Sequence, residues 1–311
     1  MYQIDYNSYR SVKSFNRRIR FLVMHYTAID FKASVAALTG SLVSSHYLVP
    51  DPSEKTYIEA GFKDMRIFNL VDENERAWHA GVSAWAGRNN LNDTSIGIEI
   101  VNLASCHSCF FEKVGEDLKD SYVLNLLDEN KHAWYADIRA SVRCKDDKSI
   151  DAGKAVSLVT DNNGVLAFPP YNPTQIAAVK ELALNILKRY PEITPINVVG
   201  HSDIAIGRKS DPGAAFPWKE LYDAGIGAWY DDELKAHYQS QFSKSLPTKE
   251  DILAKLNQYG YDISSAGTES GYKSLIRAFQ LHFRQENYDG ILDIETAAII
   301  YALVDKYFSS K

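Results

Sequence analysis

Two histidines in this sequence directly follow short apolar runs that are typical of buried strands. His25 follows FLVM and His201 follows NVVG, and the loop SDIAIGRKSDPG after His201 carries Lys209 and Asp211. Two imidazoles and one carboxylate suit Zn²⁺, and three protein ligands leave the fourth position for water, as in catalytic zinc sites. His25, His201 and Asp211 could therefore hold one catalytic Zn²⁺ per chain.

A fourth candidate, Glu99, lies inside the apolar run SIGIEIV at 95–101. A carboxylate in such a strand is costly unless a cation or hydrogen bonds hold it. Zinc lowers the pKa of its water to about 7, so a nearby carboxylate can complete the deprotonation. Glu99 is therefore the candidate base of a metal hydrolase.

Each of these residues also has an ordinary structural interpretation. A histidine at a strand end is usually a hydrogen-bonded structural residue, and Asp211 before Pro212-Gly213 could simply form a turn. Glu99 could pair with a buried arginine, and Lys209 could be a solvated loop charge. Only the combination points to zinc hydrolysis, and two histidines with one carboxylate could also form the iron site of a non-haem oxygenase.

The elements that must position these side chains are short strands, whose ends commonly carry functional residues in α/β proteins. Apolar patterning predicts strands at 19–24, 46–49, 66–70, 95–101 and 197–200. Helical spacing predicts helices over 31–42 and 174–190, the second capped by Thr174 and stopped by Pro191. Strands mixed with helices predict an α/β fold, a three-layer mixed β-sheet flanked by helices.

The C-terminal part of the chain has only helical patterns. The segment KSLPT at 244–248 precedes three short helices, expected around 252–259, 275–283 and 299–307, with Gly260 ending the first. A bundle of about 65 residues is near the lower limit for independent folding. We predict a catalytic domain at 1–245 and a small three-helix bundle at 246–311.

A partial repeat marks an inserted element. The segment IFNLVDENERAWHAG at 67–81 recurs as VLNLLDENKHAWYAD at 123–137, with Tyr135 in the place of His79 and with no counterpart of Glu99. The copy has lost polar groups that chemistry would need. We therefore interpret 105–163 as an inserted surface element without catalytic residues.

Five motifs, in order along the chain, resemble those of the zinc N-acetylmuramoyl-L-alanine amidases of the AmpD type. They are VMHYTA, SSHYLV, AWHAG, NLNDTSIGIEIVN and VVGHSDIAIGRKSDPG, beginning at residues 23, 44, 77, 90 and 198. The likeness is greatest to the AmpD homologues of Pseudomonas that carry a C-terminal module. It implies the amidase fold, shared with peptidoglycan recognition proteins, and hydrolysis of the amide between N-acetylmuramic acid and L-Ala of the stem peptide.

The resemblance also implies roles for single residues. The family's zinc ligands match His25, His201 and Asp211, and its catalytic Glu and Lys match Glu99 and Lys209. Glu99 would act as base and then as proton donor, and Lys209 would stabilise the developing oxyanion.

Five further residues are expected near the substrate. Trp78 and His79 resemble the substrate-side residues of the family. Asn102, His46 and Arg208 are candidates for substrate contacts or for support of the zinc ligands.

The tail FQLHFRQENYDGILDIETAAIIYAL at 279–303 resembles peptidoglycan-binding domains of the three-helix kind. Peptidoglycan or a muropeptide is therefore the expected partner. A helical dimerisation element is the alternative for this module, so a homo-oligomer stays open. The turn at Gly290 resembles a calcium loop only faintly, because the regular Asp spacing and the closing Glu are missing.

A non-catalytic peptidoglycan-recognition protein is the alternative for the whole chain. Such receptors share the amidase fold and bind wall fragments without cleaving them. A pure receptor has no need to keep Glu99, Lys209 and Asp211 together, so their joint presence favours the enzyme.

Composition excludes other classes of protein. The 311 residues are 45% hydrophobic and 24% charged, as in globular proteins. Basic residues number 34 against 40 acidic ones, and the resulting charge of −6 argues against a nucleic-acid partner. No apolar run reaches the roughly 18–20 residues that span a bilayer, so no membrane insertion is expected.

The N-terminal segment lacks the small-residue cleavage site of a signal peptide. We therefore expect synthesis in the cytoplasm and action in the periplasm, of the same or a target cell, after signal-independent export. A secretion system that delivers an antibacterial effector would fit, with an immunity protein as a partner at home.

Three cysteines, Cys106, Cys109 and Cys144, cannot form a closed disulfide framework because their number is odd. The CHSC segment at 106–109 with Cys144 could form a small structural zinc site. A disulfide formed after export, or free thiols, are the alternatives.

Overall fold

A computed structural model of the chain describes residues 18–103 and 164–309, together with short strands at 109–111, 142–144, 149–150 and 157–161. The first part of the chain contains β1 (Phe21–Tyr26), α1 (Phe31–Leu38), β2 (Tyr47–Val49), α2 (Lys55–Glu59), β3 (Phe68–Asn69), β4 (Ala84–Trp85), β5 (Arg88–Asn89), the 3₁₀ turn η1 (Leu91–Asp93) and β6 (Ser95–Ile100). The predicted insertion at 105–163 contains β7 (Cys109–Phe111), β8 (Val142–Cys144), β9 (Ser149–Ile150) and β10 (Ser157–Asp161), and β11 (Gly164–Phe168) follows it directly. The rest comprises α3 (Pro173–Arg189), η2 (Pro195–Asn197), β12 (Val198–Gly200), α4 (His201–Ile204), α5 (Trp218–Asp223), α6 (Asp232–Phe242), α7 (Lys249–Tyr259), η3 (Ser264–Gly267), α8 (Glu269–Phe283) and α9 (Ile294–Phe308).

A five-stranded mixed sheet forms the centre of the first part, in the order β12-β1-β6-β2-β3. All neighbours are parallel except β3, which pairs antiparallel with β2. Parallel neighbours require crossover connections, and α1 and α3 lie in two of them. The register of β1 and β6 sets His25 opposite Glu99, so the sheet itself brings two of the predicted site residues together.

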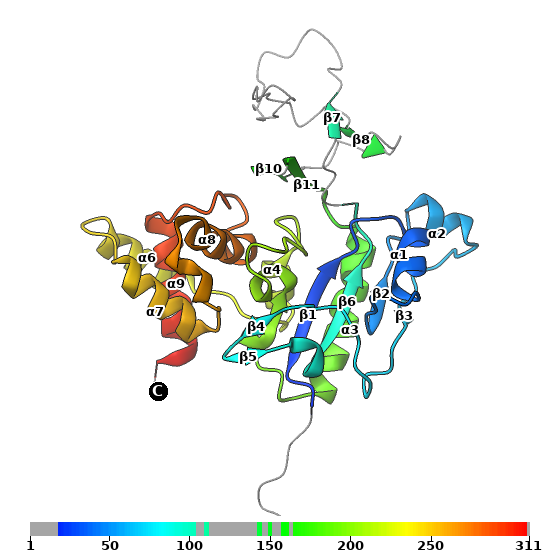
Figure 1. Ribbon diagram of the computed structural model, residues 1–311, viewed down its shortest axis with the longest axis horizontal. Coiled ribbons are helices and arrows are strands. Elements are labelled where there is room, and N and C mark those ends of the chain that lie inside the picture. The colour runs from blue at the N-terminus through cyan, green and yellow to red at the C-terminus, as the bar shows by residue number, and fades with distance from the viewer. Residues whose placement is uncertain are drawn as a thin grey trace, which may run out of the picture.

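Helices cover both faces of this sheet, which confirms the predicted three-layer α/β fold. Successive residues of β2 point to opposite faces: Leu48 packs with Phe31 of α1, whereas Val49 belongs to the core that contains Ile176 and Val179 of α3. Figure 1 shows α1 and α2 beside β2 and β3, and α3 running along the central strands.

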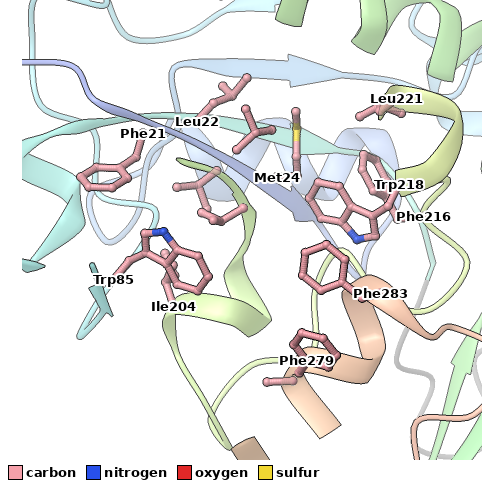
Figure 2. Packing of buried hydrophobic residues seen from close by; sticks show 14 of the residues in the cluster. Phe21, Leu22, Met24, Trp85, Ile204, Phe216, Trp218, Leu221, Phe279 and Phe283 are labelled. Carbon is pink, nitrogen blue, oxygen red and sulfur yellow. The ribbon is translucent and has the colours of Figure 1, made fainter. Parts of the chain in front are cut away.

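The C-terminal helices pack on the sheet part through a continuous apolar core. Phe279 and Phe283 of α8 lie in one cluster with Trp85, Ile204 and the strand β1 (Figure 2). The helix α6 packs against α9, and α7 also packs against α9 (Figure 1). The predicted domain boundary between residues 245 and 246 stays a prediction. The helix α6 precedes that boundary but packs against α9, which follows it.

Several predicted bounds differ from the observed ones for local reasons. The helix α1 ends at Leu38 instead of residue 42, and Leu42 is 88% exposed, so it supplies no buried contact to extend the helix. The helix α3 is capped by Asn172, whose side chain accepts a hydrogen bond from the Thr174 amide, because Pro173 occupies the first helical position. Gly260 follows α7 with a φ of 139°, as predicted.

Other sequence predictions fall outside the described residues or concern the inserted element. The repeat copy at 123–137 and Cys106 lie outside the described residues. Within the insertion, β7, β8 and β9 form a small sheet, and β10 pairs with β11. In the part of the chain that the structure describes, no helix has the length and apolar character to cross a bilayer.

Candidate metal centre and active site

Three predicted ligands converge on one point at the ends of β1 and β12. The Nδ1 atoms of His25 and His201 lie 3.0 Å apart, and the Asp211 Oδ2 lies 2.9 Å from the first and 3.0 Å from the second. All three side chains are buried. These separations are close to the about 3.3 Å expected between tetrahedral zinc ligands with bonds of about 2.0–2.1 Å.

The second nitrogen of each imidazole is held by the surrounding protein. The Nε2 of His25 lies 2.9 Å from the Nδ1 of His79, and the Nε2 of His201 donates to the carbonyl of Ala80 at 3.0 Å. His79 is itself held by the Ser95 hydroxyl, 3.0 Å from its Nε2. Outward bonds of this kind fix the tautomer of a metal-ligating histidine and orient its ring. The donor set therefore fits a zinc ion.

The pKa values of His25 and Asp211 are shifted in the directions that favour metal binding. Burial, with His201 acting in the same direction, lowers the pKa of His25 to about 4, so its imidazole is neutral at neutral pH. Burial alone would raise the pKa of Asp211, but the charge and hydrogen bonds of the two imidazoles outweigh it and lower that pKa. Neutral histidine and ionised aspartate are the forms that bind metals.

Glu99 and Lys209 lie beside this point. The Oε2 of Glu99 is buried and has no hydrogen-bond partner among the described residues. Burial, followed by the nearby Asp211, raises the pKa of Glu99 well above its usual range, and Lys209 acts against this rise. Lys209 is exposed, and its charge also acts on His25. A carboxylate with a buried oxygen and an exposed cation thus flank the three converging donor atoms.

Residues 15–214, more than half of the chain, match the family of N-acetylmuramoyl-L-alanine amidases (Amidase_2). The chain belongs to this amidase family. It is 38% identical over 307 residues to the N-acetylmuramoyl-L-alanine amidase AmiD of Escherichia coli, across 98% of this chain and 89% of AmiD. This confirms the predicted AmpD-type amidase.

Solved structures of amidases superpose on nearly the whole chain. AmpDh3 of Pseudomonas aeruginosa shares 50% identity with a TM-score of 0.76, over 99% of both chains. AmpDh3 has also been solved in complex with an anhydromuramic pentapeptide, with a TM-score of 0.77. A complex of Escherichia coli AmiD with anhydro-N-acetylmuramic acid-L-Ala-D-γ-Glu-L-Lys shares 36% identity and a TM-score of 0.70, over 99% of this chain and 96% of AmiD.

The residues predicted to lie near the substrate of this amidase divide into exposed and buried ones. Trp78 is 60% exposed, with the Arg76 guanidinium 3.8 Å above its ring. Arg208 donates to the carbonyls of Ala80 and Val82, next to the site. For both residues, contact with substrate stays a prediction.

Asn102, His46 and His79 are buried and hydrogen bonded within the protein. Asn102 donates to the carbonyl of Pro169. The Nδ1 of His46 accepts from the Gly97 amide, and its Nε2 donates to the carbonyl of Glu75. His79 contacts the predicted ligand His25, so its observed contact supports that ligand instead of exposing the ring to substrate.

Sequence reasoning missed three residues of the site: Ser95, Gly97 and Asp203. A signal for the first two existed, because Ser95, Gly97 and Glu99 alternate on one face of β6. A Cβ at residue 97 would lie 2.6 Å from the His79 ring, so glycine leaves the space that this imidazole needs. Asp203 belongs to the GHSD motif, but its contacts come from far along the chain and no local pattern indicates them.

Proposed function

We propose that this amidase is zinc dependent and cleaves the amide between N-acetylmuramic acid and L-Ala of peptidoglycan stem peptides. The observation that carries the proposal is the convergence of His25, His201 and Asp211 within 3.0 Å, with the outward nitrogens of both imidazoles already engaged. The solved AmpDh3 and AmiD complexes contain anhydromuramyl peptides, which supports the same class of substrate here.

When bound, zinc supplies a Lewis acid that polarises a carbonyl and acidifies water. Glu99 takes a proton from the attacking water as the water oxygen bonds to the lactyl carbonyl carbon. The same carboxyl then gives this proton to the L-Ala nitrogen as the C–N bond breaks, which leaves a free amine and a lactyl carboxylic acid that ionises to the carboxylate by losing its proton to solvent. The burial that raises the pKa of Glu99 suits a group that must hold a proton between these two steps.

In this scheme Lys209 stabilises negative charge and transfers no proton. The ammonium is exposed at the edge of the site and lies near Glu99, where negative charge develops on the carbonyl oxygen during attack. A cation there stabilises the transition state more than the neutral substrate, which is the condition for faster turnover.

The test is digestion of purified sacculi and of an anhydromuramyl peptide, with mass spectrometry of the released stem peptides. Glu99→Gln and Lys209→Ala should keep zinc and lose at least about a hundredfold in kcat, the range for loss of a general base or an oxyanion-stabilising group. Glu59→Gln and Lys55→Ala, at exposed positions on α2, are matched controls and should cleave normally. Undiminished cleavage by Glu99→Gln would contradict the proposal.

We further propose that the enzyme acts on wall polymer in the periplasm, of the same or a target cell, as an antibacterial effector countered by an immunity protein. The resemblance of the C-terminal region to peptidoglycan-binding domains supports a polymeric substrate. Expression of the chain in the cytoplasm and, with an added signal peptide, in the periplasm of a test bacterium should lyse cells only in the second case. Equal tolerance in both compartments would refute the effector role.

A further inference from the structure

A buried carboxylate lies directly beside the metal centre and has no part in the proposed chemistry. Asp203 has no exposed surface and stands two residues after the ligand His201, on α4. Its Oδ2 accepts from the Gly200 amide at 2.7 Å, and its two oxygens accept from two further side chains. A buried carboxylate depends on such donors, because it has lost its hydration.

Both side-chain donors come from the C-terminal helical region. The Tyr261 hydroxyl donates to Asp203 Oδ1 at 2.7 Å across 58 residues, and His282 Nδ1 lies 2.7 Å from Oδ2 across 79 residues. The His282 ring stacks on Trp218 with centroids 3.8 Å apart and the planes 16° from parallel. Two of the three hydrogen bonds to Asp203 therefore depend on how the helical region sits on the sheet.

The turn that carries Asp203 also links two of the three predicted metal ligands. The Ser202 amide donates to the carbonyl of Asp211 at 2.8 Å, so α4 is bonded to the loop that carries Asp211. Through Asp203, the same helix is bonded to the C-terminal helical region. The space is tight, since a Cβ at Gly200 would lie 2.7 Å from Pro212. A shift of α4 would therefore move His201 and Asp211 together.

The apolar surroundings leave the helical region little freedom to move away. Trp85 packs edge-on against Tyr261 with centroids 4.7 Å apart, and the Ala86 amide donates to the carbonyl of Gly260 at 2.8 Å. Figure 2 shows Phe283 of α8 close to Trp218 and Ile204 of α4 beside Trp85, and all four belong to one buried cluster in which α4 contacts α8. The contact between α8 and α4 is thus part of the main core.

We propose that Asp203, Tyr261 and His282 form a clamp through which the C-terminal helical region positions the metal-ligating turn. In this scheme, the helical region is a structural part of the metal site in addition to any contact that it makes with the wall. Asp203, Tyr261 and His282 are positioning residues that act through His201 and Asp211. The effect on zinc rests on the proposed function, whereas the clamp on α4 does not.

The deciding variant is Tyr261→Phe, which removes one donor to Asp203 and keeps the ring. Tyr307→Phe is the matched control, because its hydroxyl also bridges the helical region to the rest of the chain, at Trp229, without touching Asp203. Zinc affinity is measured by competition with a chromophoric chelator, on protein shown to be folded by circular dichroism. Tyr261→Phe should weaken zinc binding about tenfold, within the range for the loss of an outer-shell partner, and Tyr307→Phe should leave it unchanged.

A second pair of variants separates hydrogen bonding from packing at residue 282. Asn places its Nδ2 close to where His carries Nδ1, so His282→Asn should retain more zinc affinity than His282→Leu. Hydrogen exchange on the metal-free protein gives a readout independent of zinc: the peptide at 198–211, which includes the Gly200 amide, should exchange faster in Tyr261→Phe than in Tyr307→Phe.

The outcomes distinguish the two hypotheses. Equal zinc affinity and equal exchange in Tyr261→Phe and Tyr307→Phe would overturn the clamp. If the wild-type chain binds no zinc, the proposed function fails, and the exchange of 198–211 alone decides the clamp. If His282→Leu does not fold, Tyr261→Phe carries the comparison.

Discussion

The imidazole of His25 directs its Nε2 at the Nδ1 of His79, 2.9 Å away, while its own Nδ1 faces Asp211. His79 is held in turn by Ser95, so the ligand is oriented by a chain of hydrogen bonds that ends on the carbonyl of Leu91. This arrangement leaves the Nδ1 of His25 facing His201 and Asp211, where the proposed zinc ion would bind. In the proposed enzyme, His79 would therefore support metal binding without contacting substrate.

We expect His79→Leu to lower zinc affinity about 10- to 100-fold, as is usual when the partner of a metal-ligating histidine is lost. His79→Asn, whose Oδ1 can accept from His25 Nε2, should recover part of this loss. Titration with a competing chelator measures both. Zinc affinity equal to wild type in His79→Leu would contradict the orienting role.

Gly97 provides a second test of the same contact. A Cβ there would lie 2.6 Å from the His79 ring, so Gly97→Ala must displace the imidazole from His25. We expect zinc affinity to fall in this variant by a factor similar to that in His79→Leu. Gly267→Ala is the control, since nothing lies within 4 Å of a Cβ at that position. Loss of affinity in the control alone, or in neither variant, would argue against the contact.

The raised pKa of Glu99 predicts a pH dependence of stability in the metal-free protein. A carboxyl whose folded-state pKa lies above its unfolded value contributes stability that is present at low pH and lost as pH rises through the folded pKa. Each unit of difference corresponds to about 1.4 kcal/mol. Glu99→Gln lacks this loss, so it should stabilise the protein more at pH 8 than at pH 5.

Urea unfolding of wild type and Glu99→Gln in chelator, at both pH values, measures this difference. The other titrating groups are common to the two proteins, so their contributions cancel in the comparison. One of them is His25, whose lowered pKa makes stability rise with pH, opposite to the effect of Glu99. Glu59→Gln, at an exposed position, should show no such dependence on pH. A stability difference that is equal at pH 5 and pH 8 would show that Glu99 is not forced to hold its proton.

Trp78 is predicted to contribute to substrate binding and hardly to stability. Its side chain is 60% exposed, so Trp78→Ala should change the free energy of unfolding by less than about 1 kcal/mol. The same variant should raise KM for an anhydromuramyl peptide while leaving zinc content at the wild-type level. Ile291→Ala, at another exposed apolar residue, serves as the control. An unchanged KM would remove Trp78 from the substrate surface.

The sequence was informative where function depends on local pattern. His25 at the end of one apolar run and Glu99 inside another were both predicted as site residues, and the parallel register of β1 and β6 places them opposite each other. Period-two alternation in SIGIEIV also put Ser95 and Gly97 on the face of Glu99, although their contacts with His79 became clear only in the structure.

Contacts between distant segments could not be predicted in the same way. The bonds from Tyr261 and His282 to Asp203 join residues that no periodicity relates, and they depend on how two packed units meet. The start of α3 was misplaced because Asn172 and Thr174 are both good caps, and only the proline between them selects the first. The helix α1 ends before Leu42 because that side chain is exposed and gains no buried contact. Burial depends on the tertiary packing and not on the local sequence.

The central claim is that His25, His201 and Asp211 hold one zinc ion that amide cleavage requires. The most direct measurement is zinc content and cleavage of an anhydromuramyl peptide in the same samples, before and after metal removal, for wild type and His201→Ala. We predict one equivalent of zinc per chain in wild type, loss of cleavage on stripping, recovery with one equivalent, and neither zinc nor cleavage in His201→Ala. Undiminished cleavage by the stripped enzyme, or stoichiometric zinc in His201→Ala, would contradict the account.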